Sequence, residues 1–129
     1  MNAVMSFLES YSKKDVESCM SAITTNHPIL LMGTNDNEVF RSADEVRDAF
    51  ERDFANMDDI RWEEFRFSRA DASGSLATVI IELPVSYRSE GSEVRTLFRY
   101  ALTLVNENGA WKICSGVASV PFQSGSYRF

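Results

Sequence analysis

The sequence predicts an α+β fold in which helices come first and pack on one face of an antiparallel sheet. Three observations lead to this prediction. Apolar residues recur at helical spacing over residues 2–23 and again over residues 43–56. From residue 60 onward, long runs rich in β-branched and aromatic residues are separated by short turns that contain Gly, Ser or Asn. The order of these segments, helices before strands, favours a meander of strands covered on one side by the helices.

The N-terminal segment is predicted to be helical over about residues 2–23. Asp15 follows two lysines and could be the N-cap of a second, short helical piece. His27 precedes Pro28 and ends the helical region, because the residue before a proline is disfavoured in the helical conformation. The apolar stripe of this segment consists of Val4, Leu8, Tyr11, Val16, Cys19, Met20 and Ile23.

A small hairpin and a second helix follow. Residues 29–32 and 38–41 are predicted as two short strands, since a turn rich in Gly, Asn and Asp separates them. Ser42 and Glu45 then form a capping box, in which the serine caps the helix and the glutamate reaches back. This helix is predicted to run to about Asn56, and its apolar face consists of Val46, Ala49, Phe50 and Phe54.

Four longer strands are predicted in the remaining chain, over residues 60–69, 76–88, 95–105 and 111–119. Short turns join them, over residues 70–74, 89–93 and 106–109. The last turn, Asn-Glu-Asn-Gly, is typical of an antiparallel hairpin.

Length and charge narrow the class of protein. The 129 residues fit one domain, expected over residues 1–129, with a short polar C-terminal tail over residues 122–129. The net charge of −6 argues against nucleic acid and against an anionic membrane surface as partners. We expect no metal site and no cofactor, because Cys19, Cys114 and His27 lack a ligand-like spacing. With no signal peptide or membrane span in view, a cytoplasmic location is expected.

Several motifs in order along the chain resemble those of the SnoaL-like group in the nuclear-transport-factor-like, ketosteroid-isomerase-like superfamily. They are Lys14-Asp15-Val16-Glu17, the turn that leads into Ser42-Ala43-Asp44-Glu45-Val46, and Gly109-Ala110-Trp111-Lys112-Ile113 with Ser119 and Pro121 behind it. The resemblance covers nearly the whole chain. It implies a strongly curved antiparallel sheet wrapped around N-terminal helices, a cystatin-like α+β cone, with a concave pocket and dimers formed through the convex face.

Alternation along the strands gives expectations for the two faces of this sheet. Both faces carry apolar residues, so the face without helices is expected to meet a second subunit. We expect a homodimer with Phe98, Tyr100, Leu102 and Glu82 at the interface, and Arg99 on the concave face.

The concave pocket is expected to bind a small molecule. Arg99 and Tyr87 would be polar anchors, Trp62, Phe54 and Met32 would form walls, and His27 would lie at the mouth. A structural role is favoured over ligand binding for both residues: Arg99 in an ion pair with Asp53, Glu64 or Glu38, and His27 as a loop residue bonded to the backbone. Asp53 itself is expected at the surface.

A catalytic role finds little support in the residue types. Ketosteroid isomerases use a tyrosine and two aspartic acids, and the resemblance places these positions at Phe7, at Leu31 or Met32, and at Ala101. None of these side chains can transfer a proton. We therefore expect a protein that has no recognisable catalytic constellation and binds a small organic molecule, with an anionic one among the candidates. The alternatives are an isomerase, cyclase or hydrolase acting on a small hydrophobic substrate in the same pocket, and an interaction module.

Overall fold

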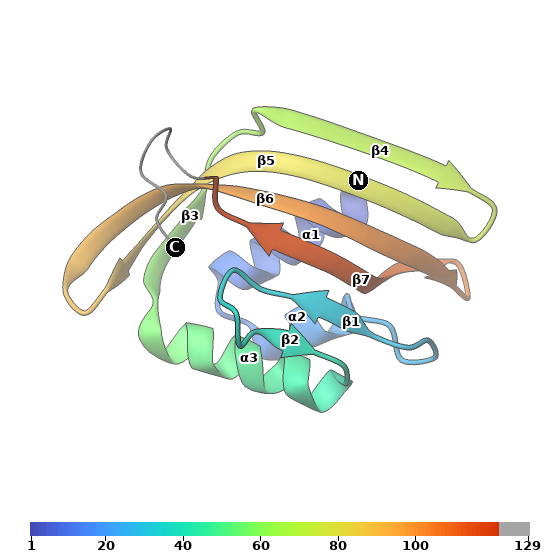
Figure 1. Cartoon of the computed structure of the whole chain (residues 1–129), viewed down its shortest axis with the longest axis horizontal. Helices are drawn as coiled ribbons and strands as arrows, with labels where there is room; N and C mark the ends of the chain where they lie inside the picture. The colour runs from blue at the N-terminus through green and yellow to red at the C-terminus, as the bar shows by residue number, and fades with distance from the viewer. Residues whose placement is uncertain (122–129) are drawn as a thin grey trace.

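A computed structural model describes residues 1–121 of the chain, so the predicted tail lies outside the described residues. Three helices, α1 (Asn2–Ser12), α2 (Val16–Ser21) and α3 (Ala43–Asn56), accompany seven strands (Figure 1). The strands are β1 (Leu30–Met32), β2 (Val39–Phe40), β3 (Asp58–Trp62), β4 (Phe67–Ser73), β5 (Leu76–Ser89), β6 (Ser92–Glu107) and β7 (Ala110–Ser119).

The helix boundaries follow from local capping. Lys14, with φ of 58°, separates α1 from α2, and the Asp15 carboxylate accepts a 3.1 Å hydrogen bond from the Ser18 amide. At α3 the Ser42 hydroxyl accepts from the Glu45 amide at 3.2 Å, and the Glu45 carboxylate accepts from the Arg41 amide at 2.9 Å. The caps predicted at Asp15 and Ser42 are therefore confirmed.

All seven strands belong to one sheet, in the order β2-β1-β7-β6-β5-β3, with β4 paired to another part of β5. The β1–β7 pair is parallel, and the other pairs are antiparallel. The sheet bends along the long β5–β6 hairpin, and α1 lies behind it in the view of Figure 1. The predicted α+β class with a curved sheet and N-terminal helices is confirmed.

The single strand predicted over residues 60–69 is wrong. The chain there forms two strands, with β3 pairing along one end of β5 and β4 along the other. Between them the Glu63 amide donates to the Pro84 carbonyl and the Arg66 amide donates to the Glu82 carbonyl. The break lets the edge of the sheet change direction while it stays attached to one long, bent strand.

A two-residue turn sets the register of β5 against β6. Glu90 and Gly91 have φ of 52° and 78°, as in a type I′ hairpin turn, and Ser89 pairs with Ser92. This register places Leu83 opposite Phe98 and Glu82 opposite Arg99. Directly opposed residues share a face of the sheet, so the first pair lies on one face and the second pair on the other.

The helices pack on the concave face, where the core forms. Val79, Ile81 and Leu83 from β5 are at most 2% exposed, and Leu102 and Leu104 from β6 are buried beside them. Val4, Phe7 and Leu8 of α1 and Val46, Phe50 and Phe54 of α3 complete this cluster. No helix within residues 1–121 is long and apolar enough to cross a membrane.

Candidate functional site

A cavity of about 310 Å³ lies between the helices and the concave face of the sheet. This volume is at the lower end of the range for small-molecule pockets. Side chains from α1, α3, the β1–β2 hairpin and strands β3, β5, β6 and β7 line it. Met32, Thr34, Asn35 and Val120 line the cavity and are exposed, so they mark its mouth.

A tyrosine and an aspartate from different helices meet on the cavity wall. The Tyr11 hydroxyl of α1 donates a 2.8 Å hydrogen bond to Oδ2 of Asp53 on α3, and both residues line the cavity. Tyr11 is buried in the core and Asp53 is half-buried. Burial is the main cause that raises the pKa of Asp53, and the Tyr11 hydrogen bond opposes it. The carboxyl group is therefore easier to protonate than an exposed aspartate.

Aromatic rings form much of the remaining wall. The ring centroids of Tyr11 and Trp62 are 5.9 Å apart, and those of Trp62 and Phe98 are also 5.9 Å apart. Phe98 and Tyr100 follow along β6 at 4.8 Å. Burial raises the pKa of Tyr100, with a smaller effect from the charge of Asp53, so its hydroxyl stays protonated and can donate a hydrogen bond. The indole Nε1 of Trp62 is closed to solvent and has no hydrogen-bond partner in the described part of the chain.

A family model described as a SnoaL-like domain matches residues 1–123. The chain belongs to the SnoaL-like domain family. No curated protein sequence matches it.

Solved structures similar to this SnoaL-like domain support the fold. One is a member of the NTF2-like family from Streptomyces avermitilis, proposed to be a dehydratase, with a TM-score of 0.84, 17% identity and coverage of 94% of this chain and 93% of that one. Another is a ketosteroid isomerase-like protein from Erwinia carotovora atroseptica, with a TM-score of 0.79, 16% identity and coverage of 95% and 93%. A cystatin-like fold from Nostoc punctiforme matches with a TM-score of 0.75 and 18% identity over 94% and 87% of the two chains.

The structure places half of the expected pocket residues on the cavity wall of the SnoaL-like domain. Met32, Trp62 and Tyr87 line the cavity. Phe54 lies behind the wall, where its ring meets that of Tyr11 edge-on at 4.9 Å and stacks on Phe50 at 6.1 Å.

Arg99 lies on the convex face, so its expected place on the concave face is wrong. Its guanidinium is paired with the Glu82 carboxylate directly across from it on β5, and Arg66 pairs with the same carboxylate at 3.3 Å. Glu82 is only 6% exposed, yet the two arginines satisfy it within the chain. The expectation of an anionic ligand loses its basis, because the arginine that motivated it is outside the cavity.

The row of β6 expected at the subunit interface faces the cavity instead. Phe98, Tyr100 and Leu102 line it, because their partners on β5 are the core residues Leu83, Ile81 and Val79. Ala101, taken above as the position of a catalytic acid, belongs to the convex row with Arg99. A shift of one residue in the assumed register exchanges the two faces of a strand, which explains these corrections together.

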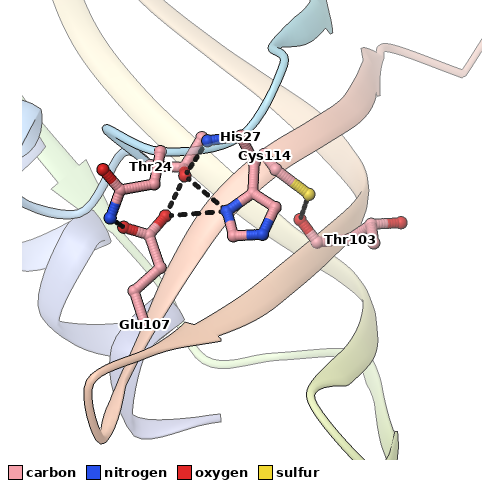
Figure 2. A network of polar contacts seen from close by, with 6 residues as sticks. Thr24, His27, Thr103, Glu107 and Cys114 are labelled. Carbon is pink, nitrogen blue, oxygen red and sulfur yellow. Dashed lines mark hydrogen bonds and ion pairs between the residues drawn. The ribbon is translucent and has the colours of Figure 1, made fainter.

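His27 lies away from the cavity, in a polar network near the end of β6 (Figure 2). Its Nδ1 is 3.3 Å from the Glu107 carboxylate, which also accepts hydrogen bonds from the Thr24 hydroxyl and from the Asn26 amide group at 3.3 Å. The Glu107 side chain is 7% exposed. The network ties the loop before β1 to the β6–β7 hairpin, and it does not place His27 at the cavity mouth.

Within residues 1–121 no group of three or more His, Cys, Asp or Glu side chains could hold a metal ion. The thiol of Cys19 is buried, and burial raises its pKa to about 12, which keeps it protonated and unreactive. The polar groups that line the cavity are carboxyl, phenol, hydroxyl, amide and indole groups among apolar walls.

Proposed function

We propose that this SnoaL-like protein binds a small organic molecule in the cavity, with apolar contacts to the walls and a hydrogen bond to the Tyr11–Asp53 pair. The observation that carries the proposal is this pair, because two polar groups converge on an otherwise mostly apolar hollow. Tyr100, which lines the same cavity from β6, would supply a second hydrogen bond.

Filling the hollow tests this proposal. Ala49 lines the cavity from α3, whereas Ala55 on the same helix is exposed. We expect Ala49→Phe to abolish the thermal shifts that a library of small aromatic and alicyclic compounds produces, and Ala55→Phe to leave them unchanged. A library that shifts neither the unmodified protein nor Ala55→Phe would contradict a binding function.

An enzyme that transfers protons is a second candidate, favoured by one observation. A carboxyl group with a raised pKa inside a cavity is the pattern of a general acid or base. Asp53 would exchange a proton with a substrate carbon or oxygen, and Tyr11 would hold the carboxyl group in place. The similar structures include a ketosteroid isomerase-like protein and a member proposed to be a dehydratase, names that suit such proton transfer.

Proton exchange measured by NMR in D₂O separates the enzyme from the binding protein. We expect an enzyme to speed the exchange of α-hydrogens on small bound ketones, and Asp53→Asn to abolish that exchange without abolishing binding. If the ketones bind but their α-hydrogens exchange no faster than in buffer alone, the enzyme is excluded and the binding function remains.

We also propose a homodimer formed through the convex face. On that face Ile80 of β5 lies opposite Ala101 of β6, and Ala101 lies opposite Val117 of β7, which also borders the cavity. Ile80 is 56% exposed and Val117 is 49% exposed, so they form an apolar row across three strands that faces solvent. Covering such a row with an identical one on a second copy would bury both.

A further inference from the structure

The cavity contains two carboxylates and no cation. Asp53 and Glu38 both line it, and no Lys, Arg or His is among the lining residues of the described chain. None of the ion pairs within residues 1–121 includes either of these carboxylates. Arg52, next to Asp53 on α3, is exposed and forms no ion pair with it within residues 1–121. Burial, the Tyr11 hydrogen bond and the charge of Glu38 each shift the pKa of Asp53 more than the charge of Arg52 lowers it.

The neutral donors around these carboxylates satisfy only part of their hydrogen-bonding capacity. Asp53 accepts one hydrogen bond, from Tyr11 at 2.8 Å. Glu38 accepts one, from the Asn35 amide at 2.8 Å. A carboxylate removed from water is costly unless it is paired, and an ionised carboxylate can accept about four hydrogen bonds. The charge of Glu38 raises the pKa of Asp53, after the larger effects of burial, which raises it, and of the Tyr11 hydrogen bond, which lowers it.

The walls around the carboxylates are of the kind that attracts cations. Aromatic faces carry negative charge density and stabilise an ammonium group within about 6 Å of the ring centre. Tyr11, Trp62, Phe98 and Tyr100 all line the cavity, next to one another. Acidic groups and aromatic rings together form a site that is complementary to an organic cation and repels an anion.

We propose that the ligand is a small organic cation, an aromatic or alicyclic amine whose protonated nitrogen is bound by the carboxylates of Asp53 and Glu38. The proposal rests on the proposed binding function and adds the chemical class of the ligand. The amine donates charge-assisted hydrogen bonds to the carboxylate oxygens that Tyr11 and Asn35 leave free. The hydrocarbon part of the ligand contacts the aromatic walls.

Three compounds that share a phenyl ring and differ in the charge of their polar group test which charge the cavity prefers. They are 2-phenylethylamine, 2-phenylethanol and 3-phenylpropionate. Their affinities are measured by titration calorimetry and by chemical-shift perturbation at pH 7 and low salt. We expect the amine to bind roughly tenfold or more tightly than the alcohol, since hydrogen bonds to charged groups exceed neutral ones by that order. The carboxylate compound should bind more weakly than the alcohol.

Two charge-neutralising variants locate the recognition. Asp53→Asn and Glu38→Gln should each reduce the ratio of amine to alcohol affinity several-fold, while the affinity for the alcohol stays within about twofold. Asp48→Asn and Glu51→Gln are matched controls, because both residues lie exposed on α3, outside the cavity lining. Neither control should change the ratio. Circular dichroism confirms that each variant is folded.

The outcomes separate this inference from the function on which it rests. Equal affinity for amine and alcohol, or tighter binding of the carboxylate compound, overturns the cationic ligand and leaves a binding protein. A preference for the amine that survives both variants overturns the role of the two carboxylates. Failure of all three compounds, together with the failure of the wider library, overturns the binding function as well.

Discussion

The hydroxyl of Tyr11 on α1 donates a hydrogen bond to the carboxylate of Asp53 on α3 at 2.8 Å, across 42 residues of sequence. This contact joins the two helices that cover the sheet and forms part of the cavity wall. The same hydrogen bond therefore contributes to stability and to the chemistry of the site. Changes at either residue should alter both in ways that can be separated by pH.

Removing the hydroxyl should destabilise the protein and leave Asp53 without a protein donor. We expect Tyr11→Phe to lower the free energy of unfolding by about 1–3 kcal/mol at pH 7, since a half-buried carboxylate loses a hydrogen bond. The loss should shrink at a pH low enough to protonate Asp53. Urea denaturation at both pH values measures it. An equal loss at both would show that the hydrogen bond to the ionised Asp53 carboxylate does not set the effect.

Asp53 should make stability fall as the pH rises. Its pKa is raised in the folded protein, so between the ordinary aspartate value of 3.8 and the raised value the folded state binds more protons than the unfolded state. Stability contributed by the protonated group is complete below 3.8 and is lost as the pH passes the raised pKa. We expect Asp53→Asn to unfold at a higher temperature than the unmodified protein at pH 7, and at a similar temperature near pH 3.

The matched control for that measurement is Asp48→Asn, which removes the same charge from the exposed side of α3. Thermal melts of the three proteins from pH 3 to pH 8 give the comparison. Parallel profiles for the unmodified protein and Asp53→Asn would mean that the Asp53 carboxylate is as well solvated when folded as when unfolded.

Much of the fold could be predicted because its signals are local. The caps at Asp15 and Ser42 depend on residues three positions away, and the buried face of α3 follows from helical spacing alone. The parallel pairing of β1 with β7 could not be predicted in this way. It joins Leu30 to Ser115, segments far apart in sequence, through a short strand with no alternating pattern.

One turn decides which row of β6 side chains faces the core. Alternation separates Phe98 from Arg99, but both rows contain enough apolar residues to be buried, so composition does not decide between them. The turn predicted over residues 89–93 hid the pairing of Ser89 with Ser92, and this pairing sets which row meets the core. On the convex face the register places Glu82 beside Arg99 and Arg88 beside Glu93. These opposite charges are a signal that a comparison of the two strands could have used.

Asp53 illustrates why the site was harder to predict than the fold. It lies three residues after Phe50 and four after Ala49, so helical spacing places it on the buried face. Aspartate is seldom buried without a partner, and an exposed position was therefore the natural expectation. Its partner, Tyr11, belongs to another helix and looks like an ordinary core residue in the stripe of α1.

Neutralising the buried carboxylate of the convex face should cost stability. The Glu82 side chain accepts from Arg99 and lies near Arg66, and these arginines are themselves about half exposed. We expect Glu82→Gln to lower the free energy of unfolding by roughly 1–3 kcal/mol, since a charge-assisted contact is lost while the arginines remain hydrated. Glu64→Gln, at an exposed position with no ion pair in the described chain, should change it by less than about 0.5 kcal/mol. Unfolding is measured with urea rather than guanidinium chloride, because a guanidinium salt would screen the ion pairs of Glu82.

The apolar row on the convex face predicts the oligomeric state. Ile80 pairs with Ala101 on β6 and with Arg69 on β4, and its side chain is 56% exposed. We expect the unmodified protein to sediment as a dimer and Ile80→Glu to sediment as a monomer, because two copies of the row would bring buried like charges together. Thr78→Glu, one step along the same face, adds the same charge beside Asp71 and Thr103, outside the apolar row, and should weaken the dimer less. A monomeric unmodified protein, or an Ile80→Glu dimer of unchanged affinity, would show that the row is not the contact between subunits.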